Sequence, residues 1–453
     1  MITPLPLKQW LSPARPDETP IAWGDKQRWT LGQLRRDVAR LQAWLRQQNA
    51  QRWALCFDNS YLFIVALLAT LGAGKTPVIP GHRRLALLEE QQALFEGLLS
   101  DEPMSWQGPF HCVASTDTAA PATVAAEAIT DSQTIELFTS GSTGQPRRIV
   151  KSIASLDREA GLLASRFAGR LHHCRVVASV IPLHLYGLTF RIFLPMALGL
   201  PLHAETIRYA EQLSVLSDRY RYLFVSSPAF LKRLDHRLTP PRLAMLLSAG
   251  GAMGQQEAMA AQAWCGIWPD EIYGSTETGV LAWRSREHAS SPWRPFPGVA
   301  FTAQEESFIA HSPLIDNPAG VLLDDILHFD ASGAFHLAGR LGRVVKIEEK
   351  RISLCDVERR LLALDGVRDA AALCVTRNGR QTVGALLVLD DTRPEAWQGQ
   401  RGRALQLKWR QALRPWLEPV AIPRYWRVVD AIPVNTMDKR VYTQLQELFN
   451  ETA

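Results

Sequence analysis

The residue types best suited to chemistry gather in one short segment, Thr139–Arg148, with the sequence TSGSTGQPRR. Glycines let the backbone turn its N–H groups toward one point, hydroxyl side chains add donors, and the arginines add positive charge. This combination suits a polyphosphate. It differs from the Walker A pattern, because no Lys-Ser/Thr pair follows the second glycine. An ordinary solvated loop rich in serine and glycine is the alternative.

Further polar or glycine-rich segments come directly after apolar runs: Pro182–Gly187 (PLHLYG), Ser248–Ala252 (SAGGA) and Tyr273–Thr278 (YGSTET). Each apolar run predicts a strand, and helical segments separate these strands along the chain. Strands that alternate with helices favour mainly parallel sheets, in which ligands bind at the carboxyl ends of the strands. All of these loops, like Thr139–Arg148, stand at such an end.

The elements that would position these loops follow in order along the chain. Thr30–Gln47 has an N-cap threonine and apolar residues at helical spacing, so it predicts an amphipathic helix. The further predicted strands up to Trp293 are Trp53–Phe57, Thr76–Ile79, Thr134–Phe138, Val176–Ile181, Tyr222–Ser226, Leu243–Ala249 and Glu271–Tyr273. The further predicted helices are Ser60–Gly72, Arg83–Glu96, Ser155–Phe167, Phe190–Leu198, Ile207–Asp218, Pro228–Asp235 and Gln255–Trp264.

Past Trp293 the sequence predicts short strands joined by turns, and then a mixture of strands and helices. We place a domain boundary at Leu341–Arg343, which separates residues 1–341 from residues 342–453. The predicted fold class is α/β. It comprises a large N-terminal domain of mainly parallel sheets flanked by helices, with a β-rich subdomain, and a small α+β C-terminal domain.

Length and composition predict a globular protein of more than one domain. A chain of 453 residues is too long for one ordinary core. No basic segment leads into an apolar run at the N-terminus, and the longest apolar stretch, Tyr61–Gly74, is too short to cross a bilayer. The six cysteines include no C-x-x-C pair, so we expect reduced thiols and a cytoplasmic location.

Positive charge is concentrated near the C-terminus. From Arg343 onward the chain has 19 Lys/Arg and 14 Asp/Glu, whereas the preceding residues have 31 of each sign. The net charge of +5 therefore belongs to the C-terminal quarter. An anionic partner that docks there is one interpretation, and an ordinary solvated surface is the other.

The order of these motifs resembles the acyl-adenylate-forming superfamily of acyl- and aryl-CoA synthetases, peptide-synthetase adenylation domains and luciferases. The resemblance extends from about Thr30 to about Leu445. It rests on the phosphate loop and YGSTET together, and more weakly on the C-terminal motifs: Asp325…Gly339-Arg340, Lys346…Arg351…Glu358 and Ile432-Pro433…Lys439.

The resemblance implies that ATP and Mg²⁺ bind and assigns residues of this chain to them. The residues that would hold the β- and γ-phosphates are Thr139, Ser140, Gly141, Ser142, Thr143, Gly144 and Arg147. Those that would bind the adenosine and the α-phosphate are Gly250, Gly251, Ala252, Tyr273, Gly274, Ser275, Thr276, Asp325 and Arg340. Alternatively, Asp325, which follows Asp324 in the sequence, is an ordinary surface residue. Glu277 would ligate Mg²⁺, a hard cation that prefers oxygen ligands. The alternative for Glu277 is a glutamate that caps a turn.

Two further residues would act on the acyl carboxylate. His184 matches the position next to this carboxylate, and Lys439 matches the mobile cation that bridges the carboxylate and the α-phosphate. A structural histidine and a solvated lysine are the alternatives. The resemblance also implies that the C-terminal domain rotates about a hinge near Gly342 and carries Lys439.

The sequence departs from the superfamily pattern at several positions. Arg147 replaces a lysine and keeps its charge, whereas Leu323-Asp324-Asp325 replaces Thr-Gly-Asp. Gly342 replaces a charged hinge residue, and Asp438 replaces the glycine before Lys439. Glu349 replaces a glycine in the turn that lines the pantetheine tunnel in the superfamily. This replacement leaves the identity of the thiol acceptor open.

The function expected from this resemblance is ATP-dependent activation of an aryl or fatty carboxylic acid. The enzyme would form acyl-AMP, release pyrophosphate, and transfer the acyl group to the phosphopantetheine thiol of an acidic acyl carrier protein. The chain is also similar to the stand-alone ligases of bacterial aryl-polyene pathways. Free coenzyme A as the acceptor is the first alternative, and a non-catalytic ATP-binding relative is the second.

Overall fold

The computed structural model describes the chain in these ranges: 3–25, 27–115, 129–140, 146–251, 253–304, 307–340, 344–347, 350–377, 380–390, 400–417, 419–434 and 440–450. The chain forms two compact units. The first consists of Met1–Ala300 with Ala310–Val321, and the second of Phe301–Ile309 with Leu322–Ala453.

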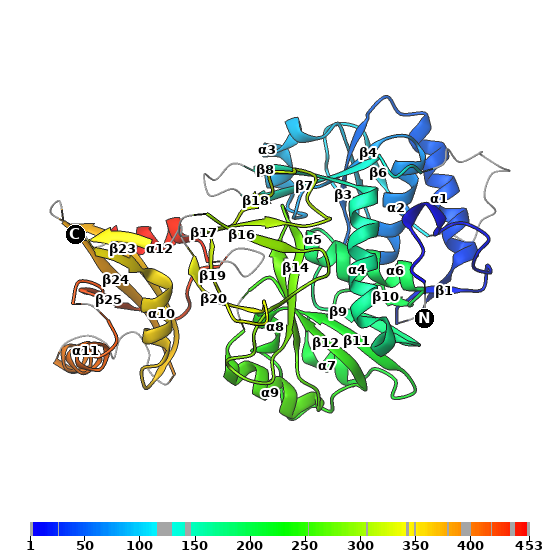
Figure 1. Cartoon of the computed structure of the whole chain (residues 1–453). Coiled ribbons are helices and arrows are strands. Elements are labelled where there is room, and N and C mark those ends of the chain that lie inside the picture. Colours follow the sequence, from blue (N-terminus) through cyan, green and yellow to red (C-terminus); the bar gives the residue numbers. More distant parts are fainter. Residues whose placement is uncertain are drawn as a thin grey trace. The chain divides into compact units, whose positions relative to one another are not determined.

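A nine-stranded sheet forms one layer of the first unit (Figure 1). Its centre is parallel, and antiparallel strands flank it at both edges. In spatial order the strands are β15 (Arg294–Pro295), β14 (Gly279–Ser285), β13 (Asp270–Ser275), β12 (Leu243–Ser248), β11 (Arg221–Ser226), β9 (Cys174–Ala178), β10 (Leu202–His203), β1 (Pro20–Trp23) and β2 (Arg28–Thr30).

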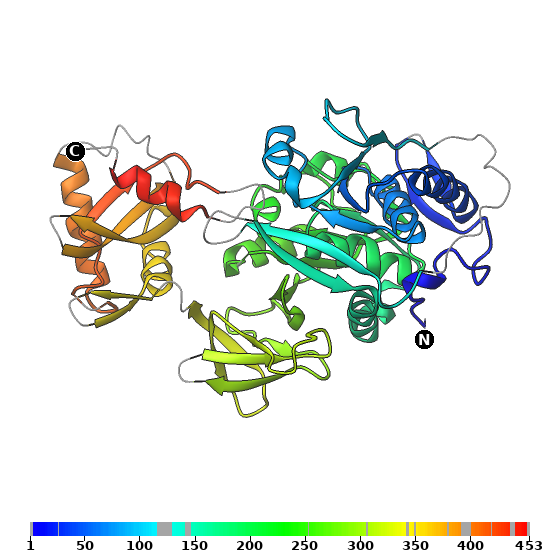
Figure 2. The same ribbon diagram turned by 90° about the horizontal axis from the view of Figure 1, so that it is seen from above.

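A six-stranded sheet forms the other layer. Its strands, in spatial order, are β6 (Phe110–Cys112), β5 (Gly97–Ser100), β3 (Arg52–Cys56), β4 (Thr76–Ile79), β7 (Thr134–Ser140) and β8 (Pro146–Ser152). These strands are parallel except for β8, which returns antiparallel to β7. The β7–β8 hairpin therefore forms an edge of this sheet (Figure 2).

Helices fill the space between the two sheets. Helix α2 (Ser60–Gly72) contacts β3 and β4 on one side and the π-helix η3 (Leu188–Phe193) on the other, and η3 in turn contacts β9. Helix α4 (Ile153–Leu171) contacts β8 of one sheet and β12 of the other. Apolar side chains from these helices and both sheets form one continuous core. Because α2 is covered on all sides, it is apolar around its whole circumference.

Short polar side chains fix where the long helices begin. Thr30, Asn59 and Ser152 cap α1 (Leu31–Arg46), α2 and α4, and each accepts a hydrogen bond from the backbone N–H three residues further on. The remaining helices of the first unit are η1 (Leu7–Gln9), α3 (Leu85–Glu90), η2 (Gln92–Leu94), α5 (Leu185–Gly187), α6 (Leu194–Leu198), α7 (Ala210–Ser214), α8 (Pro228–Leu231) and α9 (Gln255–Cys265).

The second unit contains smaller sheets. Five strands precede its hydrophobic core along the chain, and the first three are shared with the first unit: β16 (Ala300–Gln304), β17 (Ser307–His311), β18 (Val321–Leu322), β19 (Asp325–Phe329) and β20 (Phe335–Arg340). The core surrounds the sheet of β23 (Val367–Arg377), β24 (Arg380–Leu389) and β25 (Tyr425–Val428), with the hairpin of β21 (Val344–Ile347) and β22 (Lys350–Ser353) beside it. Helices α10 (Leu354–Leu362) and α11 (Gln400–Leu413) cover one face of that sheet, and α12 (Tyr442–Asn450) covers the other.

The structure confirms the predicted fold class and corrects some element bounds. Arg83–Glu96 contains only the shorter helices α3 and η2, because Arg83 forms ion pairs with Asp101 and Glu102 before the helix begins. Ile207–Asp218 contains only α7, because the backbone N–H of Ile207 donates to Ala178 O and Tyr209, just before the helix, has extended backbone angles.

The predicted domain boundary at Leu341–Arg343 lies outside the described residues and stays a prediction. The compact second unit also includes β19 and β20, which precede that boundary.

Candidate active site

The predicted phosphate loop joins the two strands of the β7–β8 hairpin. Thr139 pairs with Arg147, and Ser140 pairs with Pro146. The loop residues Gly141, Ser142, Thr143 and Gly144 lie outside the described residues. The Arg147 side chain is 66% exposed, and its Nη1 donates a hydrogen bond of 3.3 Å to Glu277 Oε1. The base of the phosphate loop and the predicted metal ligand are therefore neighbours, although they belong to different sheets.

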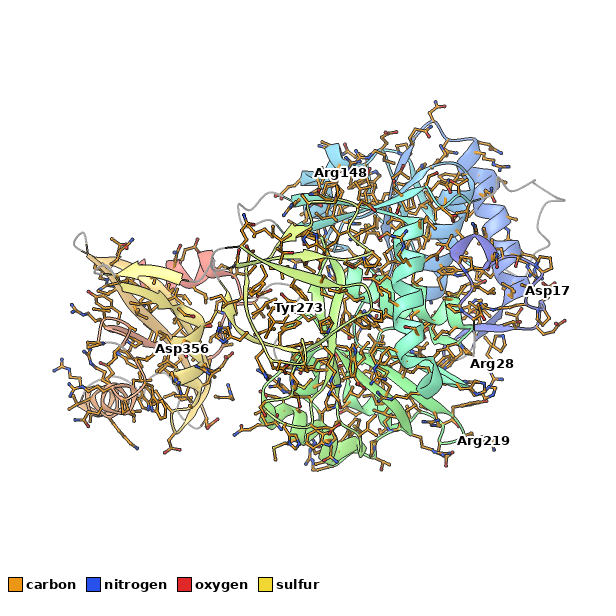
Figure 3. The ribbon with its side chains drawn as sticks, in the orientation of Figure 1. Asp17, Arg28, Arg148, Arg219, Tyr273 and Asp356 are labelled. Carbon is orange, nitrogen blue, oxygen red and sulfur yellow. The ribbon has the colours of Figure 1, made fainter. Side chains whose placement is uncertain are left out.

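Successive arginines of β8 have different partners. Arg148, labelled in Figure 3, donates to Glu136 Oε1 at 2.6 Å, and Arg52 contacts the same carboxylate. Burial alone would raise the pKa of Glu136, but the two guanidinium groups hold it below its ordinary value. Side chains alternate between the faces of a strand. Arg148 therefore neutralises Glu136, and Arg147 faces the YGSTET turn.

The YGSTET turn connects β13 to β14 and is closed by its own hydroxyl residues. The Ser275 N–H donates to Thr278 Oγ1 at 3.0 Å, and the Thr278 N–H donates to Ser275 Oγ at 3.2 Å. A Cβ at position 274 would lie 2.2 Å from Gly279 O, and Gly279 itself has φ +68°. Both glycines are thus required by the backbone. This geometry presents Thr276 and Glu277 at the tip of the turn.

Two buried charged residues that the sequence analysis missed lie behind this turn. Lys151 Nζ donates to Glu277 O at 2.9 Å, and Glu159 Oε1 accepts from the Val280 N–H at 2.8 Å. Burial lowers the pKa of Lys151 and raises that of Glu159, and the opposite charge of each partner counteracts both shifts. A lysine in a strand and a glutamate in an amphipathic helix carry no sequence signal that distinguishes them from solvated residues.

The predicted adenine-binding residues lie on neighbouring strands. Ser248 of β12 pairs with Glu271 of the parallel strand β13. Gly250 and Tyr273 each come two residues after this pair, in the same direction along the two chains. A Cβ at Gly250 would meet no heavy atom within 4 Å, and its φ is +89°. The Tyr273 ring (Figure 3) contacts Trp293 at a centroid distance of 5.7 Å. A Cβ at Gly251 would lie 3.7 Å from Pro228 Cγ, and Ala252 lies outside the described residues.

His184 lies beside the six-stranded sheet, although it follows a strand of the other sheet. A Cβ at Gly81 would lie 3.4 Å from His184 Cε1 and 3.2 Å from Phe138 O. Gly81 is therefore close both to the imidazole and to Phe138 of the strand that leads into the phosphate loop. Tyr186 anchors the same segment, because its hydroxyl donates to Ser226 O at 2.9 Å. Burial raises the pKa of Tyr186 well above its ordinary value.

The remaining predicted site residues belong to the second unit. Asp325 opens β19 and stands opposite Arg340, the last residue of β20. Lys439, Gly342, Glu349 and Asp438 lie outside the described residues. Among the described residues, no cluster of three or more His, Cys, Asp and Glu forms a metal site, and no helix has the length and apolar character of a membrane span.

Comparison with known proteins gives the family. Residues 83–305, which include the hairpin, the His184 segment and the YGSTET turn, match the family model of the AMP-binding enzymes. The fold matches that of ATP-bound MatB from Rhodopseudomonas palustris with a TM-score of 0.83, over 98% of this chain and 99% of that chain, at 17% identity. The chain belongs to the acyl-adenylate-forming superfamily.

Curated members of the superfamily align with parts of this chain. A 4-coumarate–CoA ligase of Cereibacter sphaeroides is 29% identical over 263 residues, which are 56% of this chain and 58% of that ligase. The match thus spans little more than half of that relative's length. Bacitracin synthase 3 of Bacillus licheniformis is 24% identical over 490 residues, covering 94% of this chain and 7% of that synthase. The roles of individual site residues in this member of the superfamily stay predictions.

Proposed function

We propose that this chain activates a carboxylic acid with ATP, forms acyl-AMP, and transfers the acyl group to a phosphopantetheine thiol. The observation that carries the proposal is the convergence of the phosphate-loop hairpin and the YGSTET turn, where Arg147 contacts Glu277 at 3.3 Å. Membership in the superfamily and relatives named as 4-coumarate–CoA ligases and as a nonribosomal peptide synthetase support it.

The first step is an in-line displacement at phosphorus. A carboxylate oxygen attacks the α-phosphorus of ATP, the new O–P bond forms, and the bond to the pyrophosphate oxygen breaks. The site must hold the two anions together and stabilise the negative charge that develops between them. In the proposal Arg147 neutralises the terminal phosphates and Thr276 donates to the α-phosphate. His184 borders the carboxylate, and Lys439 bridges the two reacting groups.

Glu277 fits the role of a Mg²⁺ ligand. Its carboxylate is a hard oxygen donor at the tip of a rigid turn, its side chain is 28% exposed, and it stands next to the phosphate-loop hairpin. When bound, Mg²⁺ would neutralise phosphate charge and orient ATP. Two carboxylate oxygens beside a single exposed arginine leave coordination capacity for a metal ion.

We further propose that the thiol belongs to an acidic acyl carrier protein. The positive surplus of the chain lies in residues 343–453, and Arg403 of α11, within this segment, is exposed. The Arg360 guanidinium lies 4.5 Å from the ring centroid of Trp416, which is 60% exposed. An exposed aromatic ring beside cations is suited to an anionic protein surface. The competing acceptor is free coenzyme A, which the name of the Cereibacter relative favours.

A cytoplasmic location is part of the same proposal. All six cysteines are described, and each is a free thiol. Free thiols are typical of a reducing compartment, where ATP is also available.

Carboxylate-dependent exchange between ATP and labelled pyrophosphate tests the activation step without any acceptor. A panel of benzoates, cinnamates and fatty acids of increasing length should contain members that stimulate exchange well above the acid-free rate. An ATP-binding protein with no exchange on the full panel would instead support the non-catalytic alternative.

A further inference from the structure

We propose that Lys151 and Glu159 are positioning residues that lock the Glu277 turn to the strand and helix following the phosphate loop. The inference rests on the proposed function, because it assigns Glu277 to metal binding. Lys151 is 5% exposed and Glu159 is 2% exposed, and they lie on consecutive elements, β8 and α4. Both side chains bond backbone atoms of the turn, so they act on the predicted metal ligand through the turn.

Strand β8 holds Glu277 at two points. Residues 147 and 151 are four positions apart in a strand, so their side chains share one face. Arg147 Nη1 contacts the Glu277 carboxylate at 3.3 Å, and Lys151 Nζ donates to the Glu277 backbone carbonyl at 2.9 Å. The strand that leaves the phosphate loop therefore fixes both the backbone and the side chain of the predicted metal ligand.

Glu159 fixes the other end of the turn. Its Oε1 accepts from the Val280 N–H at 2.8 Å, and its Oε2 accepts from Thr189 Oγ1 at 2.7 Å. A Cβ on Gly279 would lie 2.7 Å from Oε1, so a glycine there lets the carboxylate approach. Thr189 belongs to η3, the π-helix that continues from the His184 segment. One carboxylate thus links the turn to the π-helix that follows the His184 segment along the chain.

Stability alone does not explain why Lys151 and Glu159 are buried here. Desolvating a lysine and a glutamate is costly, and an apolar pair of similar volume often stabilises a core equally well. The charged groups therefore serve to position the turn: the Lys151 ammonium group holds the carbonyl of residue 277, and the Glu159 carboxylate holds the N–H of residue 280. Ser275 and Thr278 close the turn between them.

The test compares Lys151→Met with a matched control, Lys75→Met. Lys75 is 6% exposed, and its Nζ also donates to backbone carbonyls, those of Gln48 and Ala50, between other elements. Binding of the non-cleavable analogue α,β-methylene-ATP is measured by calorimetry at a series of Mg²⁺ concentrations. Lys151→Met should raise the Mg²⁺ concentration for half-maximal binding about tenfold, the effect of losing one charge-assisted hydrogen bond. Lys75→Met should lower the melting temperature by a similar amount but leave the Mg²⁺ concentration for half-maximal binding unchanged.

Glu159→Gln is the second variant, because it keeps an oxygen for the Val280 N–H and removes the negative charge that acts on Lys151 through space. It should shift the Mg²⁺ dependence in the same direction by a smaller factor and keep the KM for the carboxylate. Mg²⁺ dependence equal to that of Lys75→Met in both variants would overturn the inference. Normal analogue binding without carboxylate-dependent exchange in the wild type would instead remove the proposed function and leave the positioning result standing.

Discussion

Glu277 shows how a single residue gains a role from its surroundings. Its backbone carbonyl is held by Lys151 and its carboxylate lies beside Arg147, yet the side chain remains partly exposed. A glutamate that merely capped the turn would direct its carboxylate to backbone N–H groups of the turn. Ser275 and Thr278 already bond those groups.

Glu277→Gln should raise the Mg²⁺ concentration needed for half-maximal pyrophosphate exchange by about tenfold or more, because an amide is a weaker ligand for a hard cation. Stability should change by less than about 1 kcal/mol, since the lost ion pair is exposed. A Mg²⁺ titration of the exchange rate and a urea denaturation curve measure the two quantities. Wild-type metal dependence in this variant would exclude Glu277 from the metal site.

Lys439→Ala should separate the two half-reactions. If Lys439 stabilises charge only during adenylation, its loss should slow acyl-AMP formation by about two to three orders of magnitude. The same variant, supplied with chemically prepared acyl-AMP, should still form thioester at nearly the wild-type rate. Equal losses in both assays would show that the lysine has a structural role or a different chemical one.

The sequence reveals some site residues and conceals others for physical reasons. The YGSTET segment is recognisable because a tight turn needs glycines and a metal needs a carboxylate, and both requirements act on neighbouring residues. Lys151 and Glu159 act across three elements, and their partners are backbone atoms of any residue type. No residue pattern along the chain encodes such contacts. Only the packing of α4 and β8 against the turn reveals them.

At the scale of elements, a helix or strand can be predicted where neighbouring residues in the sequence mark its ends. The sequence predicts both bounds of α2 because Asn59 caps its start, Gly72 is its last residue and Gly74 follows shortly after. Strand β8 is missed because its arginines and lysine suggest a solvated loop, whereas the structure uses them for Glu136 and Glu277. Strand β14 is also missed, and so is the division of the strands between two sheets, since pairing partners are distant in sequence.

The attachment of the N-terminal segment to α4 should depend on pH. Both Asp157 carboxylate oxygens accept from the Leu7 N–H, and burial raises the pKa of Asp157 from its ordinary 3.8 to about 6. A raised acid pKa contributes stability that is complete below pH 3.8 and is lost as the pH rises through about 6.

Asp157→Asn removes this titration. Its free energy of unfolding relative to the wild type should therefore rise between pH 4.5 and pH 7.5, by about 1 kcal/mol after allowance for solvent screening. Chemical denaturation at both pH values measures the change, with Asp131→Asn as the control for a nearby exposed carboxylate. A difference that does not vary with pH would contradict the assignment.

At the scale of the whole molecule, the distribution of charge bears on the acceptor. Acidic carrier proteins would be attracted by the positive surplus of residues 343–453, and salt weakens such attraction because the Debye length falls from about 10 Å at 0.1 M to about 3 Å at 1 M. Coenzyme A is anionic too, but its small phosphates need a local basic pocket rather than a broad charged surface.

We expect an acyl carrier protein to outcompete coenzyme A as acceptor, with a kcat/KM that falls steeply with salt while pyrophosphate exchange hardly changes. Charge reversal at Arg403 or Arg410 of α11 should weaken carrier use about tenfold and leave exchange intact. We expect the same effect of charge reversal at Arg401, whose side chain lies outside the described residues. Efficient transfer to coenzyme A without carrier activity at low salt would favour the CoA-ligase alternative.

The central claim is that a carboxylate oxygen attacks the α-phosphorus of ATP at the site between the hairpin and the YGSTET turn. The most direct measurement uses a carboxylate that supports exchange, labelled with ¹⁸O in both oxygens, and follows the label by mass spectrometry after transfer to the thiol. The bridging oxygen stays with phosphorus when the acyl group leaves, so the account predicts AMP that contains one ¹⁸O atom. Formation of ADP with the label in inorganic phosphate, or of AMP without label, would contradict it.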